Sequence, residues 1–195
     1  MTDRNYFEEE KFEKIDFSKN PLVVGDYENC QFIQCEFSKA ILSGIRFVEC
    51  EFNGCNLSVA KLDNTAFKDI LFKDCKLLGL HFQDCDQFLF SASYENCSLN
   101  ISSFSNMKLK KIKFLKSVLH EVDFTGADLS GAVFDHCDMT GAIFKNTILE
   151  GADFRTAFNY SLDPELNKMK RAKFSVAGIG GLLDKYDIDI EDPLR

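Results

Sequence analysis

The side chains best suited to chemistry in this chain are its eight cysteines. A thiolate can bind zinc, pair in a disulfide or act as a nucleophile. Zinc sites use ligand pairs at short spacings such as C-x2-C, and the cysteines follow steps of five and twenty residues instead. Cys85 falls in an irregular segment. The other seven share one repeated small position: Cys30, Cys35, Cys50, Cys55, Cys75, Cys97 and Cys137. We therefore expect free structural thiols, with a metal site or a disulfide as the alternative.

Other catalytic chemistry finds little support in the sequence. His81, His120 and His136 are scattered and have no obvious nucleophile beside them. Neither a phosphate-binding loop nor a dinucleotide fingerprint occurs. The carboxylates fall at positions that should face solvent. These patterns predict a protein that is not an enzyme and that binds no cofactor.

A repeat of five residues positions all these groups, and it is clearest from Val122 to Phe154. This period is neither the 3.6 of a helix nor the 2.0 of a strand. A large apolar residue stands at every fifth position, and a small one stands two residues before most of them. The large ones are Phe124, Leu129, Phe134, Met139, Phe144, Leu149 and Phe154. The same phase runs from Phe7 to Phe82 and resumes at Leu89.

The pattern resembles the pentapeptide-repeat family. That resemblance implies an all-β fold, a right-handed quadrilateral parallel β-helix in which four repeats make one square coil. The large residue and the small one two before it then point inward. Residues twenty apart should stack, so Phe12, Phe32, Phe52 and Phe72 form one column and Tyr94, Phe114, Phe134 and Phe154 another.

The repeat predicts two regions. Residues 1–156 form the β-helix, which is interrupted at 83–88, because Phe82 and Leu89 are seven residues apart instead of five. The two extra residues form either a loop or an offset between coils. Asp84 and Asp86 favour a solvated loop, and we treat both as candidate partner-binding residues.

Residues 157–195 form an irregular final coil and a capping segment. Asp163-Pro164-Glu165 predicts a turn, Val176 to Lys185 a short helix and Tyr186 to Ile190 a strand. A solenoid must cover its open end, and this segment is the natural cap. It carries more apolar side chains than a cap can bury. We therefore predict a homodimer through Ile179, Leu182, Leu183 and Tyr186.

Charge is distributed unevenly along the chain. The net charge is −8, and most of the acid excess lies in residues 1–88. This balance disfavours direct binding to nucleic acid or to an anionic membrane. Glu9, Asn29, Glu49 and Asp69 are twenty residues apart and should form an acidic ladder, which is a candidate site for a cationic partner. Five lysines within Lys108 to Lys116 interrupt any continuous negative surface.

Taken together, the residues indicate a binding module. No apolar run is long enough to span a membrane and no signal peptide precedes Tyr6, so we expect a cytoplasmic protein. Within the family, the chain is similar to the Qnr-type quinolone-resistance members. This likeness implies an acidic rod that imitates DNA, binds DNA gyrase or topoisomerase IV and protects it from quinolones. The alternative is a scaffold that docks another cytoplasmic protein.

Overall fold

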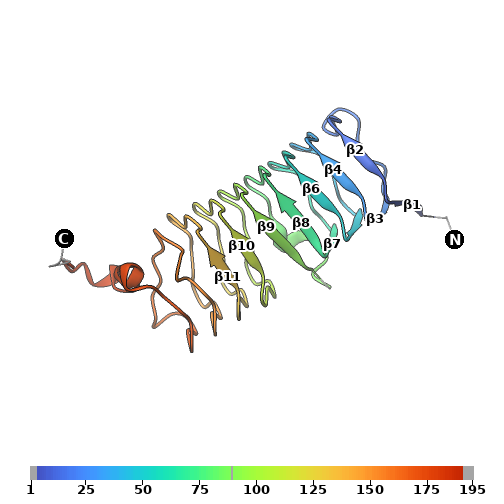
Figure 1. Ribbon diagram of the computed structural model, residues 1–195. Coiled ribbons are helices and arrows are strands. Elements are labelled where there is room, and N and C mark those ends of the chain that lie inside the picture. The colour runs from blue at the N-terminus through green and yellow to red at the C-terminus, as the bar shows by residue number, and fades with distance from the viewer. Residues whose placement is uncertain (1–3, 89, 191–195) are drawn as a thin grey trace.

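The computed structural model describes residues 4–88 and 90–190, which form a straight rod of stacked coils with its termini at opposite ends (Figure 1). Two parallel sheets run along it. The four-stranded sheet contains β1 (Asn5–Glu8), β3 (Gly25–Glu28), β5 (Arg46–Val48) and β7 (Ala66–Lys68). The seven-stranded sheet contains β2 (Lys11–Glu13), β4 (Gln31–Ile33), β6 (Glu51–Asn53), β8 (Ile70–Lys73), β9 (Ala92–Glu95), β10 (Lys113–Leu115) and β11 (Val133–Asp135). The predicted parallel β-helix is confirmed.

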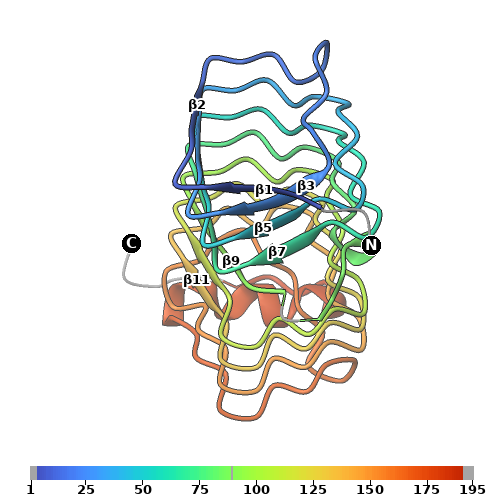
Figure 2. The ribbon, with the colours of Figure 1, turned by 90° about the vertical axis from the view of Figure 1, so that its right-hand side faces the viewer.

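Strand pairing follows the predicted step of twenty residues. Phe12 pairs with Phe32, and Phe32 pairs with Phe52. The strands of the four-stranded sheet lie one below another on a single wall (Figure 2). The walls without named strands are joined by isolated parallel bridges at the same spacing, such as Glu36 with Asn56 and Asp123 with Ile143. Every coil therefore sits in register on the one before it.

The core is a set of ring and aliphatic columns inside the rod. One stack has parallel rings with centroids 4.7–5.4 Å apart, and it runs through Phe12, Phe32, Phe52, Phe72, Tyr94, Phe114, Phe134, Phe154 and Phe174. Both predicted aromatic columns are thus parts of one stack. Neighbouring stacks meet it edge to face, as Phe124 meets Phe134 at 6.0 Å. Phe7 and Phe12, at the open N-terminal end, are only partly buried.

The corners between walls are closed in two ways. In the first, the backbone N–H of the small residue donates to the carbonyl three residues earlier, as Ala132 does to Leu129 (2.9 Å). In the second, a side chain supplies the bond. The Cys55 thiol donates to the carbonyl of Phe32 (3.2 Å), and its sulfur accepts from the N–H of Cys35 (3.4 Å). A thiol at such a corner thus satisfies backbone groups of the preceding coil.

The eight cysteines are all free and buried. The predicted column of Cys35, Cys55 and Cys75 continues across the irregular segment to Cys97, because Lys76 pairs with Ser98. Burial raises the pKa of Cys50 and of Cys137 to about 12, so these thiols stay protonated at neutral pH. The prediction that Cys85 lies in an irregular segment, outside the repeated inward positions, was wrong. It occupies an ordinary inward position, and its N–H donates to the carbonyl of Phe82 (3.0 Å).

The irregular segment is a loop and not an offset. Ala66 still pairs with Asp86, twenty residues on, whereas Ile70 pairs with Ala92, twenty-two residues on. The two extra residues therefore lie between Asp86 and Ala92, somewhat later than the predicted 83–88. The chain before them forms a short 3-10 helix, η1 (Phe82–Asp84). The seven-stranded sheet continues unbroken past the loop, because β8 pairs directly with β9.

Two aromatic residues flank the point of insertion differently. Phe88 is 79% exposed, and Phe90 packs its ring edge to face against Phe67 (6.3 Å) and Phe82 (6.1 Å). The repeat had placed Leu89 inside the core, and that residue lies outside the described part of the chain. Phe90 thus contributes to the core at a position that the five-residue phase did not predict.

The C-terminal segment covers the last coil. The predicted turn forms, since Asp163 Oδ1 accepts from the N–H of Glu165 (2.9 Å). The predicted helix is present as two 3-10 helices, η2 (Val176–Leu182) and η3 (Asp184–Tyr186). The predicted strand from Tyr186 to Ile190 was wrong. Tyr186 ends η3, Asp187 then adopts a left-handed φ of 48°, and residues 187–190 have no strand structure.

Candidate protein-binding surfaces

The acidic ladder lies at one corner of the rod. Glu9, Asn29, Glu49 and Asp69 each follow the last residue of a strand in the four-stranded sheet. The register stacks them, because Glu9 N–H donates to Glu28 O (3.0 Å) and Glu49 N–H to Lys68 O (2.8 Å). All four are exposed and have φ between 51° and 56°. We call this column the acidic corner.

Carboxylates of the acidic corner have no ion pair within the described residues, and neither have the neighbouring Glu8, Glu28 and Glu51. Glu28 instead accepts a hydrogen bond from the Tyr6 hydroxyl (2.8 Å), which raises the pKa of Tyr6 to about 12. Glu51 accepts from the amide of Asn53 (3.4 Å). The negative charge of this corner is therefore not compensated by an ion pair among the described residues.

Several carboxylates on the later coils are neutralised within the chain. Asp153 is bound by Arg155 (2.7 Å) and approached by Lys173 (3.8 Å). His120 Nε2 lies 2.9 Å from Asp138 Oδ2. Burial acts to raise the pKa of Asp138, but hydrogen bonds from His120, Thr140 and Asn159 outweigh burial and lower it to about 2. Sequence reasoning gave the net charge of each segment but not this difference in pairing.

The structure does not bring Asp84 and Asp86 to the acidic corner. Asp86 pairs with Ala66, the first residue of β7, whereas Asp69 follows the last residue of that strand. The two sites thus lie on opposite edges of one wall. Asp86 Oδ1 accepts from the N–H of Phe88 (2.9 Å), so this carboxylate also shapes the loop. The predicted partner-binding residues therefore form two separate groups.

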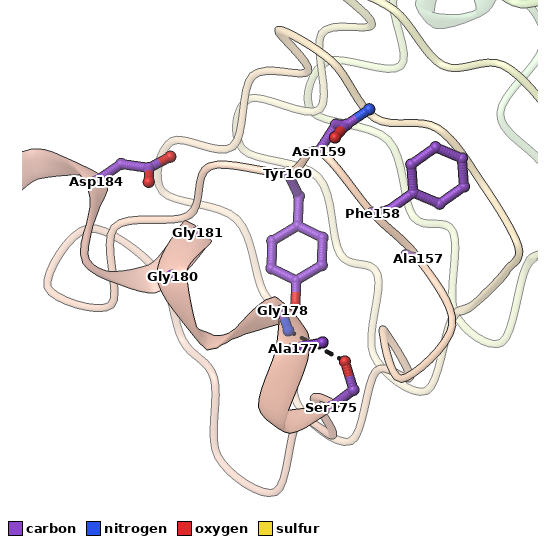
Figure 3. Close-up of a pocket in the computed structure, with 10 residues that line it drawn as sticks. All are labelled: Ala157, Phe158, Asn159, Tyr160, Ser175, Ala177, Gly178, Gly180, Gly181 and Asp184. Atoms are coloured by element: carbon purple, nitrogen blue, oxygen red, sulfur yellow. Dashed lines mark hydrogen bonds between the residues drawn. The ribbon is translucent and has the colours of Figure 1, made fainter. Parts of the chain in front are cut away.

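The capping segment borders an open pocket of about 460 Å³ against the last coil (Figure 3). The ring of Tyr160 lies between η2 and the last coil, where it lines this pocket, and it packs against Phe174 with ring centroids 5.8 Å apart. Gly178 and Gly181 allow this approach, because a Cβ at either position would collide with Tyr160. Leu162 N–H donates to Gly181 O (2.8 Å), which fixes η2 to the rod.

The predicted dimerisation residues differ in exposure. Ile179 is 44% exposed and Tyr186 is 53% exposed, but Leu182 packs partly against the core. Leu183 is also partly buried. Next to Tyr186, the Lys185 ammonium bridges Asp163 Oδ1 and Glu165 Oε2 (both 2.8 Å). Leu182 thus belongs to the cap itself, and Ile179 and Tyr186 are left on its outer surface.

The described residues offer neither a metal site nor a membrane-spanning helix. Within residues 4–88 and 90–190, no three His, Cys, Asp or Glu side chains are grouped so that they could hold a metal ion. None of the described helices is long and apolar enough to cross a bilayer. His81 Nδ1 lies 3.1 Å from the Gln83 amide, and His136 Nδ1 lies 2.8 Å from Asp135. The three histidines therefore contact different surface residues and do not form one site.

The chain was compared with known protein structures and families. The chain resembles the solved structure of full-length QnrB1, a plasmid-mediated fluoroquinolone resistance protein, at 23% identity and a TM-score of 0.38, over 94% of this chain and 100% of that chain. It resembles HetL, a pentapeptide-repeat protein involved in heterocyst differentiation regulation in Nostoc sp. strain PCC 7120, at 14% identity and a TM-score of 0.39, over 90% of each chain. No curated protein matches significantly. The family description "Pentapeptide repeat region" matches residues 25–88, and "Pentapeptide repeats (8 copies)" matches residues 117–155. The chain belongs to the pentapeptide-repeat family.

Proposed function

We propose that this protein is a non-enzymatic binding module whose acidic corner docks on a basic surface of another protein in the cytoplasm. The observation that supports this function is the column formed by Glu9, Glu49 and Asp69, which lacks ion pairs among the described residues. Neighbouring coils are about 4.8 Å apart, so carboxylates stacked on them repel one another. A partner with matching lysines or arginines would relieve that repulsion.

The partner that best fits is a type II topoisomerase, DNA gyrase or topoisomerase IV. These enzymes bind duplex DNA, whose backbone is a regular line of negative charges. A straight rod with a column of carboxylates at one corner imitates part of that line, and its rigidity lowers the entropy lost on binding. In this proposal the protein occupies the DNA-binding surface and protects the enzyme from quinolones. Asp84 and Asp86 would form a second contact across the same wall.

The test is a gyrase supercoiling assay with and without a quinolone. The wild-type protein should restore supercoiling in the presence of the drug. The triple variant Glu9→Gln, Glu49→Gln, Asp69→Asn should lose most of this effect. A matched control changes the same amount of charge elsewhere, with Glu95→Gln, Glu121→Gln and Glu150→Gln, and should keep it. Equal behaviour of the two triple variants would rule out the acidic corner, and a wild type without any effect would rule out protection of gyrase.

We also propose that the protein is a homodimer joined through its capping segment. The outer surface of this segment exposes Val176 (89%), Ile179 (44%), Tyr186 (53%), Ile188 (54%) and Ile190 (57%). Apolar patches of this kind mark interfaces. A two-fold axis at the tip would bring two copies of the patch together, with Leu182 and Leu183 beneath it. Both acidic corners would then lie toward the outer ends of a rod twice as long.

Light scattering at micromolar concentration tests the dimer. The wild type should have twice the mass of the chain, and Ile179→Asp should be a monomer because a buried unpaired charge opposes association. Ile143→Asp is the matched control, since Ile143 is 49% exposed but lies on a wall of the rod. It should remain a dimer. A monomeric wild type would contradict the proposal.

A further inference from the structure

The acidic corner changes sign further along the rod. Leu71 pairs with Ser93, and Ser93 pairs with Lys113, so the column of Asp69 continues through Ser91 to Lys111. Lys111 is exposed and, like the acidic residues before it, adopts a positive φ (60°). One corner thus carries carboxylates up to Asp69 and an ammonium group two coils later. The change occurs where the two extra residues enter the chain.

The surface is hollowed at this point. One hollow of about 380 Å³ is lined by side chains that include Asp69, Ser91, Ser93, Lys111 and Lys113. A smaller one of about 110 Å³ lies beside Lys108, Lys110 and Lys111, and the two share Ser91, Ala92 and Lys111. Together they form a trough over the corner, which we call the lysine trough.

The trough is rich in positive charge that the chain does not neutralise. Lys108, Lys111 and Lys113 are exposed and have no ion pair within the described residues. Lys110 alone is paired, with Asp128 at 3.4 Å. On the other side, Ser91 holds Asp69, because its hydroxyl donates to Asp69 Oδ1 (2.9 Å) and accepts from Asp69 N–H (2.7 Å). The trough therefore has one negative end and a predominantly positive floor.

We propose that the lysine trough binds an acidic segment of a protein partner in an extended conformation. Three unpaired ammonium groups within one coil complement a short row of Asp or Glu side chains. Nucleic acid fits less well. Its longer phosphate chain would run on toward the acidic corner and be repelled. The trough also lacks an exposed ring for base stacking, because its aromatic residue, Phe90, packs on Phe67 and Phe82.

The probe is a short fluorescein-labelled peptide of alternating Glu and Ser, and binding is followed by fluorescence anisotropy at low salt. Lys111→Glu combined with Lys113→Glu should raise Kd at least about tenfold, since two attractions become repulsions. The matched control, Lys168→Glu with Lys170→Glu, makes the same charge change on exposed residues of the last coil and should leave Kd nearly unchanged. Binding should weaken as salt is added, because the lysines are exposed.

Asp69→Asn separates this inference from the proposed function. It removes the negative end of the trough and should tighten peptide binding by about two- to threefold. The same change should weaken binding to a basic partner at the acidic corner. The inference is overturned if the wild type does not bind the peptide, or if both lysine pairs have equal effects. It is also overturned if single-stranded DNA of equal charge binds as tightly as the peptide.

Discussion

The corner that carries the acidic residues is built differently in the two halves of the rod. In the first half its inward position holds Cys30 and Cys50, whose thiols donate to backbone carbonyls such as Tyr27 O (3.3 Å). In the second half it holds Ala132 and Ala152, and the backbone closes the turn, as Ala152 N–H does with Leu149 O (3.0 Å). The backbone carbonyls at this corner of the coil thus accept hydrogen bonds either from a side chain or from the main chain.

The residue just outside this corner differs in the same way. Glu49 and Asp69 stand there in the first half, with φ of 51° and 54°, and Gly131 and Gly151 in the second, with φ of 69° and 68°. A left-handed φ costs a residue with a side chain about 1 kcal/mol or more, but it costs glycine little. The first half therefore accepts backbone strain and keeps unpaired charge. The last two coils of the second half relax this corner with glycine, and carboxylates such as Asp138 and Asp153 are paired there.

The largest effect should come from the core, where the two halves do not differ. Phe134 and Phe32 are fully buried in the same ring stack. Phe134→Ala and Phe32→Ala should each lower the free energy of unfolding by about 3–5 kcal/mol, as deletion of a buried ring does. Urea unfolding measures both. Phe88→Ala is the control and should have little effect, because Phe88 is exposed. A clearly smaller loss at either buried position would show that the halves are packed unequally.

The corner chemistry should give an intermediate effect. Cys55→Ala leaves the Phe32 carbonyl without its thiol donor, whereas Cys85→Ala removes a buried thiol from a corner that the backbone already closes. The first change should therefore cost about 1 kcal/mol more than the second. Cys55→Ser should recover part of the difference, since Ser117 in the same column accepts from Cys97 N–H (3.1 Å). Thermal unfolding of the three variants checks this, and equal losses at Cys55 and Cys85 would remove the distinction between the two corners.

Charge pairing in the second half should give the smallest effect, which is present near neutral pH and disappears in acid. The folded-state pKa of Asp138, about 2, is below its ordinary value of 3.8. Its contribution to stability is thus fully present above about pH 4 and is lost as the pH falls through about 2. Asp138→Asn should abolish this contribution, about 1 kcal/mol after screening by solvent, and Asn159→Ala should remove part of it. Urea unfolding between pH 2 and pH 6 measures it. A pH dependence unchanged in Asp138→Asn would contradict the assignment.

The five-residue phase was enough to predict the core. Each large residue from Phe17 to Phe82 and from Tyr94 to Phe154 is buried, because one repeat fixes both the direction of each side chain and the residue on which it stacks. The acidic corner could be placed for the same reason. Its stacking follows from a step of twenty residues and needs no knowledge of side-chain contacts.

Features that depend on hydrogen-bond partners could not be predicted in this way. The alternation of Tyr186, Ile188 and Ile190 suggested a strand, but a strand needs a neighbour, and the left-handed Asp187 follows η3 instead. The role of a thiol such as that of Cys55 depends on a carbonyl 23 residues earlier, which the residue type does not reveal. The sequence shows the five lysines from Lys108 to Lys116, but it does not reveal that Lys111 and Lys113 line a trough with Asp69, because that depends on where the two extra residues leave the wall.

The way in which the rod absorbs those two residues has a consequence for how such proteins can change. Between Asp86 and Ala92 the chain lengthens while the sheet passes from β8 to β9 without a gap. Insertions at this site alter the outline of the molecule and leave the register of every later coil intact. It is therefore a natural point at which longer arms could be grafted, and a family of partners could be reached from one unchanged core.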